Sequence, residues 1–567
     1  MIIFFISISR DMFNFLSGDK NKTWLDLLFL SLIFLIAILT YGLPALFSPD
    51  ETRYAEIARE MIKTHEFIVP HLDGVIYFEK PPLIYWLTAV YLKLFGLNEW
   101  AARLVNPILS LSYIIFQYLL IKRILNSRNI ALLSSLFCLT SLLYLVMSRY
   151  LNLDIGVAIF INCSLLTFLA SIYSQNKSKT WLTLSFVFSF LAVMTKGLIG
   201  LVFPMMVIGL WVIFTGRFFI LKNYRLYLGA ILVLLVSSIW IFAVNSRYPD
   251  FFHYYVIVQQ FLRFTTNEQH RSMNIIVYFV CVFAIFIPWL GFLPALVKNY
   301  FNNWFNTNLE EKFLIIWFLS IVAFFAFSHS VLIGYFLPLI APVSILIAQK
   351  LKMDFQNNTM SSSNKIPLIL AISFLILFAI AGVVVPLIPK FDYYQSTLMS
   401  VFFSMSLILL PIIIFSILYL KRKKVRTLLC LIIFGMCIIV NCSWIGAEYL
   451  SSKTVKPLIN IAQSIMKSNE STIIAGYHDY FYGASFYLHY KLWLVDKPGE
   501  LEITGKMRNS GAKYTLKTET QLWDAWHSPQ KVLMFMRKKD YDSLLNQNKH
   551  KLILVKATSK MVLVTNK

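Results

Sequence analysis

The sequence predicts a polytopic α-helical membrane protein that carries a small α/β domain outside the membrane at its C-terminal end. Hydrophobic residues make up 58% of the 567 residues, whereas charged residues make up only 14%. Apolar runs of about 18 residues or more recur along the chain, and such runs are long enough to cross about 30 Å of hydrocarbon as a helix. From about residue 452 the composition changes to short β-like runs separated by polar stretches.

The hydropathy pattern predicts about thirteen membrane spans. They lie near 25–44, 101–121, 130–148, 152–174, 180–195, 197–215, 227–244, 275–298, 313–330, 331–349, 367–387, 399–420 and 427–446. The apolar segment 81–97 is short, opens with two prolines and contains Lys93. Counting it as a span would move every later cation-rich loop to the outer side, so we expect a juxtamembrane helix there.

The cations of the chain give its orientation. The net charge is +23, but the lysines and arginines cluster in short loops between spans, which excludes a nucleic-acid-binding surface as their explanation. With the N-terminus inside, these loops lie on the inner side, and the polar loop after the first span and the C-terminal tail lie outside. The six cysteines lie in or beside apolar runs and predict no disulfide framework.

Three regions follow from this pattern. We expect a cytoplasmic segment over 1–24, a transmembrane domain over 25–450 with an outer first loop at 45–100, and an outer α/β domain over 451–567. The β-like runs of the last region are 472–477, 491–495, 531–537 and 551–565. This region has neither a Gly-rich phosphate loop nor a regular metal-ligand spacing, so the sequence assigns it no chemistry of its own.

The polar stretch from Ser48 to Pro82 is the most heavily charged part of the first 450 residues. Asp50 and Glu51 follow the first span closely, and apolar residues recur at helical spacing through 51–64. An amphipathic helix here would lie flat on the membrane, with its charges toward a cavity or toward water. Two interpretations stay open: a ligand site, or a solvated connector whose acids cap the helix start.

Further polar residues lie close to the predicted membrane surface. Lys80, beside two prolines, is placed either to bind a phosphate or to snorkel from a helix start. Asp154 and Lys196 lie at span boundaries, where ionisable groups are functional candidates unless they simply neutralise each other. Tyr335 is placed either to bind a ligand or to belong to an interfacial aromatic belt. The outer loop 245–274 is basic and aromatic, and its His253 and His270 lack ligand spacing.

Three sequence blocks together resemble a known family. SPDETRYAEIAREM, YFEKPPLIYWL and NEWAARLVNPI, all within 48–108, resemble the polyprenyl-phosphate-dependent membrane glycosyltransferases of the GT-C class. Among these the chain is most similar to the bacterial lipid A 4-amino-4-deoxy-L-arabinose transferases. The resemblance implies about thirteen spans, an outer C-terminal α/β domain, and sugar transfer at the periplasmic face of the inner membrane.

The resemblance also implies roles for individual residues. Asp50 matches the aspartate regarded as the catalytic acid/base, and Lys80 matches the lysine expected to hold the donor phosphate. The remaining positions match residues that line the substrate cavity: Arg53, Tyr54, Tyr77, Glu79, Asp154, Lys196, Arg263 and Tyr335. The implied partners are a polyprenyl-phosphate sugar donor, a lipid A or other envelope acceptor, and membrane lipids.

The chain departs from the family pattern at two blocks. It reads Gln259-Gln260-Phe261-Leu262-Arg263-Phe264 where the family commonly has Glu-His-x-x-Arg-Phe, and Ser330-Val331-Leu332 where the family often has Ser-Lys-Leu. The sugar, the acceptor and a requirement for a divalent cation therefore stay open. Alternatives are the same donor class with a protein or another envelope glycan as acceptor, or a transporter without chemistry. Transport is disfavoured because the sequence has no repeated halves.

Overall fold

The computed structural model describes residues 23–174, 176–262, 273–387, 395–450, 455–467, 472–497, 499–507, 510–548 and 550–567. The described residues form two compact units, each assembled from segments that are distant in sequence. The first unit contains the described residues of 1–41, 106–238 and 260–446, and the second contains those of 42–105, 239–259 and 447–567. The predicted segment 1–24 falls almost entirely outside the described residues.

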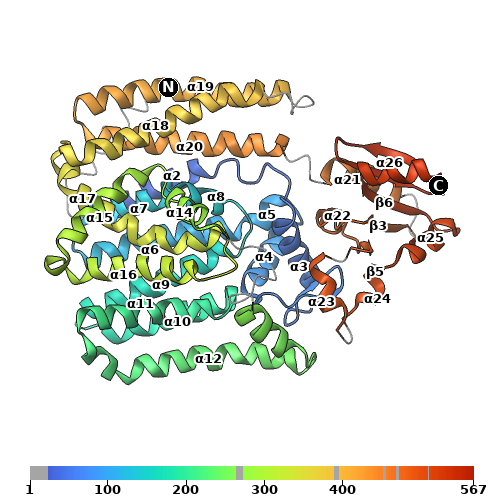
Figure 1. Ribbon diagram of the computed structural model, residues 1–567, viewed down its shortest axis with the longest axis horizontal. Helices are drawn as coiled ribbons and strands as arrows, with labels where there is room; N and C mark the ends of the chain where they lie inside the picture. The colour runs from blue at the N-terminus through green and yellow to red at the C-terminus, as the bar shows by residue number, and fades with distance from the viewer. Residues whose placement is uncertain are drawn as a thin grey trace. The chain divides into compact units, whose positions relative to one another are not determined.

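The first unit is helical, and its long helices run side by side (Figure 1). Its α-helices are α2 (Thr23–Ala37), α6 (Val105–Ile124), α7 (Arg128–Thr140), α8 (Leu142–Met147), α9 (Asp154–Tyr173), α10 (Ser178–Lys196), α11 (Ile199–Thr215), α12 (Tyr224–Asn245), α14 (Ile275–Ala284), α15 (Leu293–Asn302), α16 (Leu309–Ala326), α17 (Ile340–Asn357), α18 (Ser362–Val384), α19 (Gln395–Lys421) and α20 (Val425–Leu450). Short 3-10 turns join several of them: η1 (Phe218–Lys222), η3 (Trp289–Phe292), η4 (Trp304–Asn306), η5 (Ile333–Leu339) and η6 (Val385–Leu387).

The chain is a multi-span membrane protein. Within the described residues, eight helices are long and apolar enough to cross a membrane, and a bent pair would make nine. Every one of the thirteen predicted spans coincides with an apolar helix or helix pair, but several of these helices are too short to count, so the number thirteen stays a prediction.

The predicted span 275–298 is broken in the structure. It consists of two helices, Ile275–Ala284 and Trp289–Asn302, with a bend of 102° between them. Pro288 lies at the break, and a proline lacks the amide hydrogen that would continue a helix. The predicted span 130–148 is likewise interrupted, because α7 ends at Thr140 and α8 begins at Leu142.

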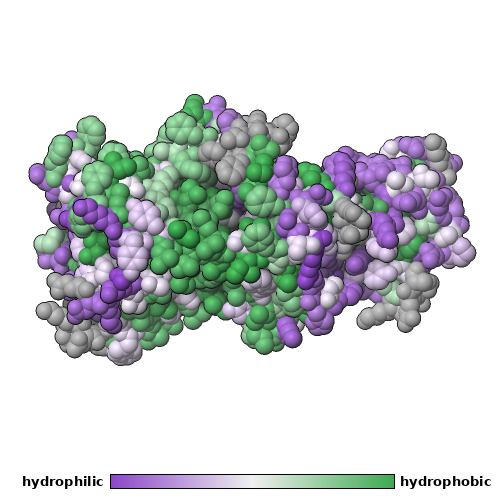
Figure 2. All heavy atoms as spheres, turned by 90° about the horizontal axis from the view of Figure 1, so that it is seen from below, coloured by the Kyte–Doolittle hydropathy of each residue, from purple (hydrophilic) through white to green (hydrophobic). Residues whose placement is uncertain are grey.

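The spans differ in how much apolar surface they expose. The apolar window of α9 is 94% buried, whereas that of α12 is 22% buried. Leu228, Ile231, Leu235 and Phe242 are among the exposed large side chains of α12. Figure 2 shows a broad apolar surface on one face of the molecule, as expected of helices that contact lipid rather than water.

The second unit combines the predicted outer loop with the C-terminal region. Its first part holds α3 (Asp50–Thr64), a small hairpin of β1 (His71–Leu72) and β2 (Val75–Ile76), α4 (Leu83–Phe95) and α5 (Glu99–Arg103). The helix η2 (His253–Leu262) begins within the segment 239–259 of the same unit. The 13-residue α4 corresponds to the predicted juxtamembrane segment. At 1.5 Å per residue it is about 20 Å long, which is less than the hydrocarbon thickness.

The C-terminal part of this unit is an α/β structure around a six-stranded sheet. Its helices are α21 (Lys456–Lys467), α22 (Gly483–Leu488), η8 (Gly499–Leu501), α23 (Glu502–Gly505), α24 (Ala512–Thr515), α25 (Glu519–His527) and α26 (Lys538–Gln547). The strands are β3 (Ile473–Tyr477), β4 (Trp493–Val495), β5 (Leu516–Lys517), β6 (Val532–Arg537), β7 (Ile553–Ala557) and β8 (Met561–Thr565), in the order β5-β4-β3-β6-β8-β7.

Strands β3 to β6 are parallel, and β7 and β8 are antiparallel additions at one edge. Residues of β3, β6 and β8, among them Ala475, Met534 and Val564, form one buried core with Leu522 and Trp526 of α25. The four predicted β-like runs are confirmed, and the last of them contains two strands. The two-residue β5 was not predicted, because Leu516–Lys517 is too short to show a pattern.

Candidate active site

The acidic pair at the start of α3 is divided between two roles. Glu51 is completely buried and pairs with Arg103 of α5, whose Nε and Nη2 donate to the two carboxylate oxygens at 2.8 and 2.6 Å. The same guanidinium donates to the carbonyls of Pro44 and Ala45 at 2.6 and 2.9 Å. Asp50, by contrast, keeps 45% of its side chain exposed. Glu51 therefore anchors the loop, and Asp50 is the carboxylate of the pair that stays accessible.

Arg53 lies in contact with three other predicted site residues. Its Nη2 forms an ion pair with Asp50 and lies 3.3 Å from the hydroxyl of Tyr54. The guanidinium carbon lies 4.8 Å from the ring centre of Tyr54 and 5.9 Å from that of Tyr77. Because the Arg53 side chain is 7% exposed, it holds the Asp50 carboxylate in a defined direction. Two blocks of sequence, 50–54 and 77, thus meet at one cluster.

The second block continues from Tyr77 toward α4. Phe78 is buried against Phe251 and Tyr248, with ring centres 4.9 and 5.4 Å away, which fixes the backbone that leads to the EKPP residues. Lys80 is buried just before α4, and Glu79 is half-buried. A buried lysine does not match a freely snorkelling side chain, which would keep its ammonium group in water.

The solvated-connector interpretation of α3 is wrong. Besides Glu51 and Arg53, the helix buries Glu56, Arg59 and Glu60, each at most 3% exposed. Arg59 donates to both carboxylate oxygens of Glu56 at 2.6 and 2.7 Å. The helical periodicity of 51–64 was predicted correctly, but its polar face packs inside the unit rather than toward water.

The turn of the β1–β2 hairpin ties these buried acids to the C-terminal part of the unit. Gly74 N donates to Glu60 Oε2 at 3.0 Å. The Asp73 carboxylate accepts from the Tyr480 hydroxyl at 2.5 Å and from Leu492 N at 3.3 Å, and the Asp73 carbonyl accepts from Thr515 Oγ1 at 2.5 Å. The turn of the hairpin is therefore hydrogen-bonded both to α3 and to the C-terminal part of the unit.

This arrangement predicts a pH-dependent stability. Burial, followed by the charge of Asp73, raises the pKa of Glu60 to about 7, and Glu56, Arg59 and Lys491 also act on it. The pKa of Glu60 is higher in the folded protein than in the unfolded chain. The contribution of Glu60 to stability is therefore fully present below about pH 4.5 and is lost as the pH rises through about 7. Glu60→Gln should therefore stabilise the protein at pH 8, by up to about 3 kcal/mol, and change little at pH 5.

Thermal unfolding of both proteins in detergent at the two pH values measures this effect. Glu502→Gln, which replaces an exposed carboxylate of α23, is the control and should shift neither midpoint. Equal differences between Glu60→Gln and the wild type at pH 5 and pH 8 would contradict the prediction.

A second group of predicted residues lies in the first unit. Asp154, the first residue of α9, forms an ion pair with Lys196, the last residue of α10. The ammonium group of Lys196 lies 3.9 Å from the ring centre of Tyr335. A Cβ atom at the neighbouring Gly334 would collide with the Asp154 carboxylate, so glycine lets the turn approach. The three residues meet, and Asp154 and Lys196 neutralise each other, as one of the two sequence interpretations of this pair predicts.

The block 259–264, which differs from the family pattern, is described only as far as residue 262. Gln259 Nε2 donates to the Tyr254 hydroxyl at 2.9 Å, and Gln260 Oε1 accepts from Leu198 N at 3.3 Å. His253 is exposed. Arg263 and His270 lie outside the described residues, so the predicted role of Arg263 stays a prediction.

Arg103 is the main residue that sequence reasoning did not single out. It lies in the block NEWAARLVNPI, but its partner Glu51 is 52 positions earlier in the chain. Nothing in the sequence around this arginine indicates that it pairs with an acid so far away in the chain. Only the fold shows that Arg103 is completely buried and forms an ion pair with Glu51.

Comparisons with known proteins show which proteins the chain resembles in sequence and in fold. The family model described as dolichyl-phosphate-mannose-protein mannosyltransferase matches residues 22–255. Undecaprenyl phosphate-alpha-4-amino-4-deoxy-L-arabinose arabinosyl transferase 1 of Proteus mirabilis (strain HI4320) is 33% identical over 328 residues, which cover 56% of this chain and 58% of that protein. Transferase 2 of the same organism is 31% identical over 325 residues, with 56% and 58% covered.

The resemblance to these membrane glycosyltransferases is confirmed. The crystal structure of ArnT from Cupriavidus metallidurans bound to undecaprenyl phosphate superposes with a TM-score of 0.83 over 95% of this chain and 97% of that one. At 24% identity this likeness shows the shared fold. The chain matches less than two thirds of the length of the curated relatives just named.

Proposed function

We propose that this chain is a glycosyltransferase that moves a sugar from an undecaprenyl-phosphate donor to lipid A at the periplasmic face of the inner membrane. The sugar proposed is 4-amino-4-deoxy-L-arabinose, which is part of the names of the two curated relatives. The observation that carries the proposal is the Asp50 carboxylate, which is accessible and is held by Arg53 in the same loop that buries Lys80.

The proposed reaction is one displacement at the anomeric carbon of the sugar. An acceptor oxygen forms the new bond to this carbon while the bond to the donor phosphate oxygen breaks, and polyprenyl phosphate leaves with the electron pair. Asp50 takes the proton from an acceptor hydroxyl, or positions an acceptor phosphate that is already ionised. A single displacement inverts the configuration of the anomeric carbon.

Lys80 is proposed to stabilise the charge that develops on the leaving phosphate. Arg53 acts as a positioning residue, because it orients the Asp50 carboxylate. Asp154, Lys196 and Tyr335 are proposed to contact the donor, as is Arg263. In this proposal the Asp154 carboxylate and the Tyr335 ring together hold the Lys196 ammonium group in place.

Lipid A mass spectrometry tests the donor and the acceptor together. A bacterial host that lacks its own transferase, but makes the donor, would express either the wild type or Asp50→Asn. We expect lipid A that carries one added aminoarabinose with the wild type and unmodified lipid A with the variant, at equal amounts of protein in the membrane. Unmodified lipid A with both would contradict lipid A as the acceptor.

Lys80→Ala tests the phosphate contact. Loss of a charge-assisted hydrogen bond costs about 1.5–3 kcal/mol, so the apparent KM for the donor should rise by about tenfold to a hundredfold. Lys63→Ala removes an exposed lysine from the last turn of α3 and is the matched control. An unchanged donor KM in Lys80→Ala would contradict the proposed contact.

A further inference from the structure

Three strands of the C-terminal sheet end in register and place three ligand-type side chains at one edge. Tyr477 of β3 pairs with Val495 of β4, and Val495 pairs with Lys517 of β5. His478 and Asp496 are the residues that follow the first two strands, and Glu519 lies two residues after the third. Because parallel strands end at the same edge, these side chains are brought together although 18 and 23 positions separate them.

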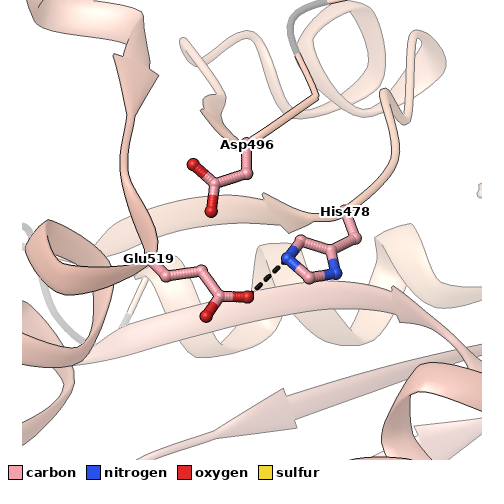
Figure 3. Close-up of side chains that lie close together, drawn as sticks. All are labelled: His478, Asp496 and Glu519. Atoms are coloured by element: carbon pink, nitrogen blue, oxygen red, sulfur yellow. Dashed lines mark ion pairs between the residues drawn. The ribbon is translucent and has the colours of Figure 1, made fainter.

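The three side chains converge on one point (Figure 3). Their ligand atoms, an imidazole nitrogen and two carboxylate oxygens, all lie within 4.8 Å of one another. His478 Nε2 is 2.5 Å from Glu519 Oε1, and within the described part of the chain the Asp496 carboxylate accepts no hydrogen bond. Both His478 and Asp496 have a positive φ, 50° and 54°, which turns them out of their strands at matching positions.

A cavity of about 310 Å³ opens at this edge. It is lined by His478, Asp496, Lys497, Arg537, Lys539 and Asp540. The chain passes from β3 to β4 and β5 on one side of β3 and returns to β6 on the other, so the cavity lies where the strand order reverses. Open α/β sheets bind ligands outside the carboxyl ends of their strands at such a point.

We propose that His478, Asp496 and Glu519 bind one divalent transition-metal ion of the Zn²⁺ or Mn²⁺ class. One imidazole and two carboxylates are a mixed ligand set that these ions accept, whereas Ca²⁺ and Mg²⁺ prefer oxygen ligands alone. The two carboxylates balance the charge of the ion. His478 and Glu519 each keep 39% of the side chain exposed, so water or an anion completes the coordination.

Neighbouring groups support this ion and its open positions. The Tyr477 hydroxyl donates to Glu519 Oε1 at 2.7 Å, and the Tyr477 ring stacks on His478 with ring centres 4.0 Å apart. Such contacts orient metal ligands and typically change metal affinity about 10–100-fold. Lys497 and Lys539 line the same cavity and would attract an anionic group to the open side of the ion. The site is independent of the proposed transfer reaction.

Metal titration of the full-length protein tests the site. The protein would be purified in detergent, stripped with a chelator, and titrated by calorimetry with Zn²⁺ alone. We expect Asp496→Asn, Glu519→Gln and His478→Gln each to lose one equivalent of Zn²⁺ relative to the wild type, or to bind that equivalent at least about 100-fold more weakly. Asp524→Asn, an exposed carboxylate of α25 in the same region, is the matched control and should retain it.

A second readout separates metal binding from damage to the fold. Co²⁺ bound by nitrogen and oxygen ligands absorbs visible light, and this absorption should disappear in the three variants while their unfolding temperature without metal equals that of the wild type. The same stoichiometry and affinity in all variants as in the wild type would overturn the proposal. An equal loss in Asp524→Asn would overturn it as well.

Discussion

Asp50→Asn should lower the rate of sugar transfer by about a hundredfold to ten-thousandfold, the range attributed to one general acid–base group. The amide keeps the size of the carboxylate but accepts no proton from the acceptor. Because Asp50 is 45% exposed and Glu51 carries the buried ion pair, the substitution should leave the folded protein intact. Initial rates with donor and acceptor in nanodiscs measure the effect.

The control for this variant is another carboxylate of the same loop. Glu66 pairs with Arg247 near the surface and accepts from the amides of Ile68 and Val69 through Oε1. Glu66→Gln keeps an acceptor for these amides and should transfer sugar at the wild-type rate. Full activity in Asp50→Asn, at equal donor binding, would contradict the general-base role and leave Asp50 at most a structural residue.

Arg103→Leu should be among the most destabilising single substitutions in the second unit. It leaves the Glu51 carboxylate buried without its cation and the carbonyls of Pro44 and Ala45 without their donor. Breaking a buried ion pair on one side costs about 3–5 kcal/mol. We expect a much lower yield of monodisperse protein and a lower unfolding temperature, measured by size-exclusion chromatography and thermal unfolding in detergent.

The chain supplies a matched comparison for this pair. Arg247 and Glu66 form an ion pair whose side chains are 46% and 28% exposed, so Arg247→Leu should cost about 1 kcal/mol or less. The double variant Arg103→Leu with Glu51→Leu should recover part of the lost stability, because it removes the buried charge as well. Equal stability of Arg103→Leu and Arg247→Leu would contradict the anchoring role of Glu51.

Much of the architecture follows from local patterns in the sequence. Apolar runs located the helices of the first unit, and β-like runs located β3, β4, β6 and the pair β7–β8. The helical spacing of 51–64 located α3 within one residue of its observed start. These patterns are local because hydrophobic periodicity reflects which face of one element is buried.

The features that the sequence did not predict depend on distant partners. The burial of Glu56, Arg59 and Glu60 requires the hairpin turn and the C-terminal part of the unit around them, which no window along α3 contains. The break at Pro288 was hidden inside a continuous apolar run.

The grouping of His478, Asp496 and Glu519 likewise arises from strand register rather than from spacing in the sequence. For that reason the C-terminal region was predicted to have no chemistry, although the sheet places three ligand-type side chains together. Resemblance supplied the candidate roles of Asp50 and Lys80, whereas the fold distinguished Asp50 from its neighbour Glu51.

The most direct test of the proposed function is the release of polyprenyl phosphate by the purified protein. The wild type and Asp50→Asn would be incubated with an undecaprenyl-phosphate aminoarabinose donor, with and without lipid A, and the lipid products separated. We predict that the wild type releases polyprenyl phosphate only when lipid A is present, in an amount equal to the sugar that lipid A gains. The variant should release none. A donor that stays intact with lipid A present, or is consumed equally by both proteins, would contradict the proposed transfer.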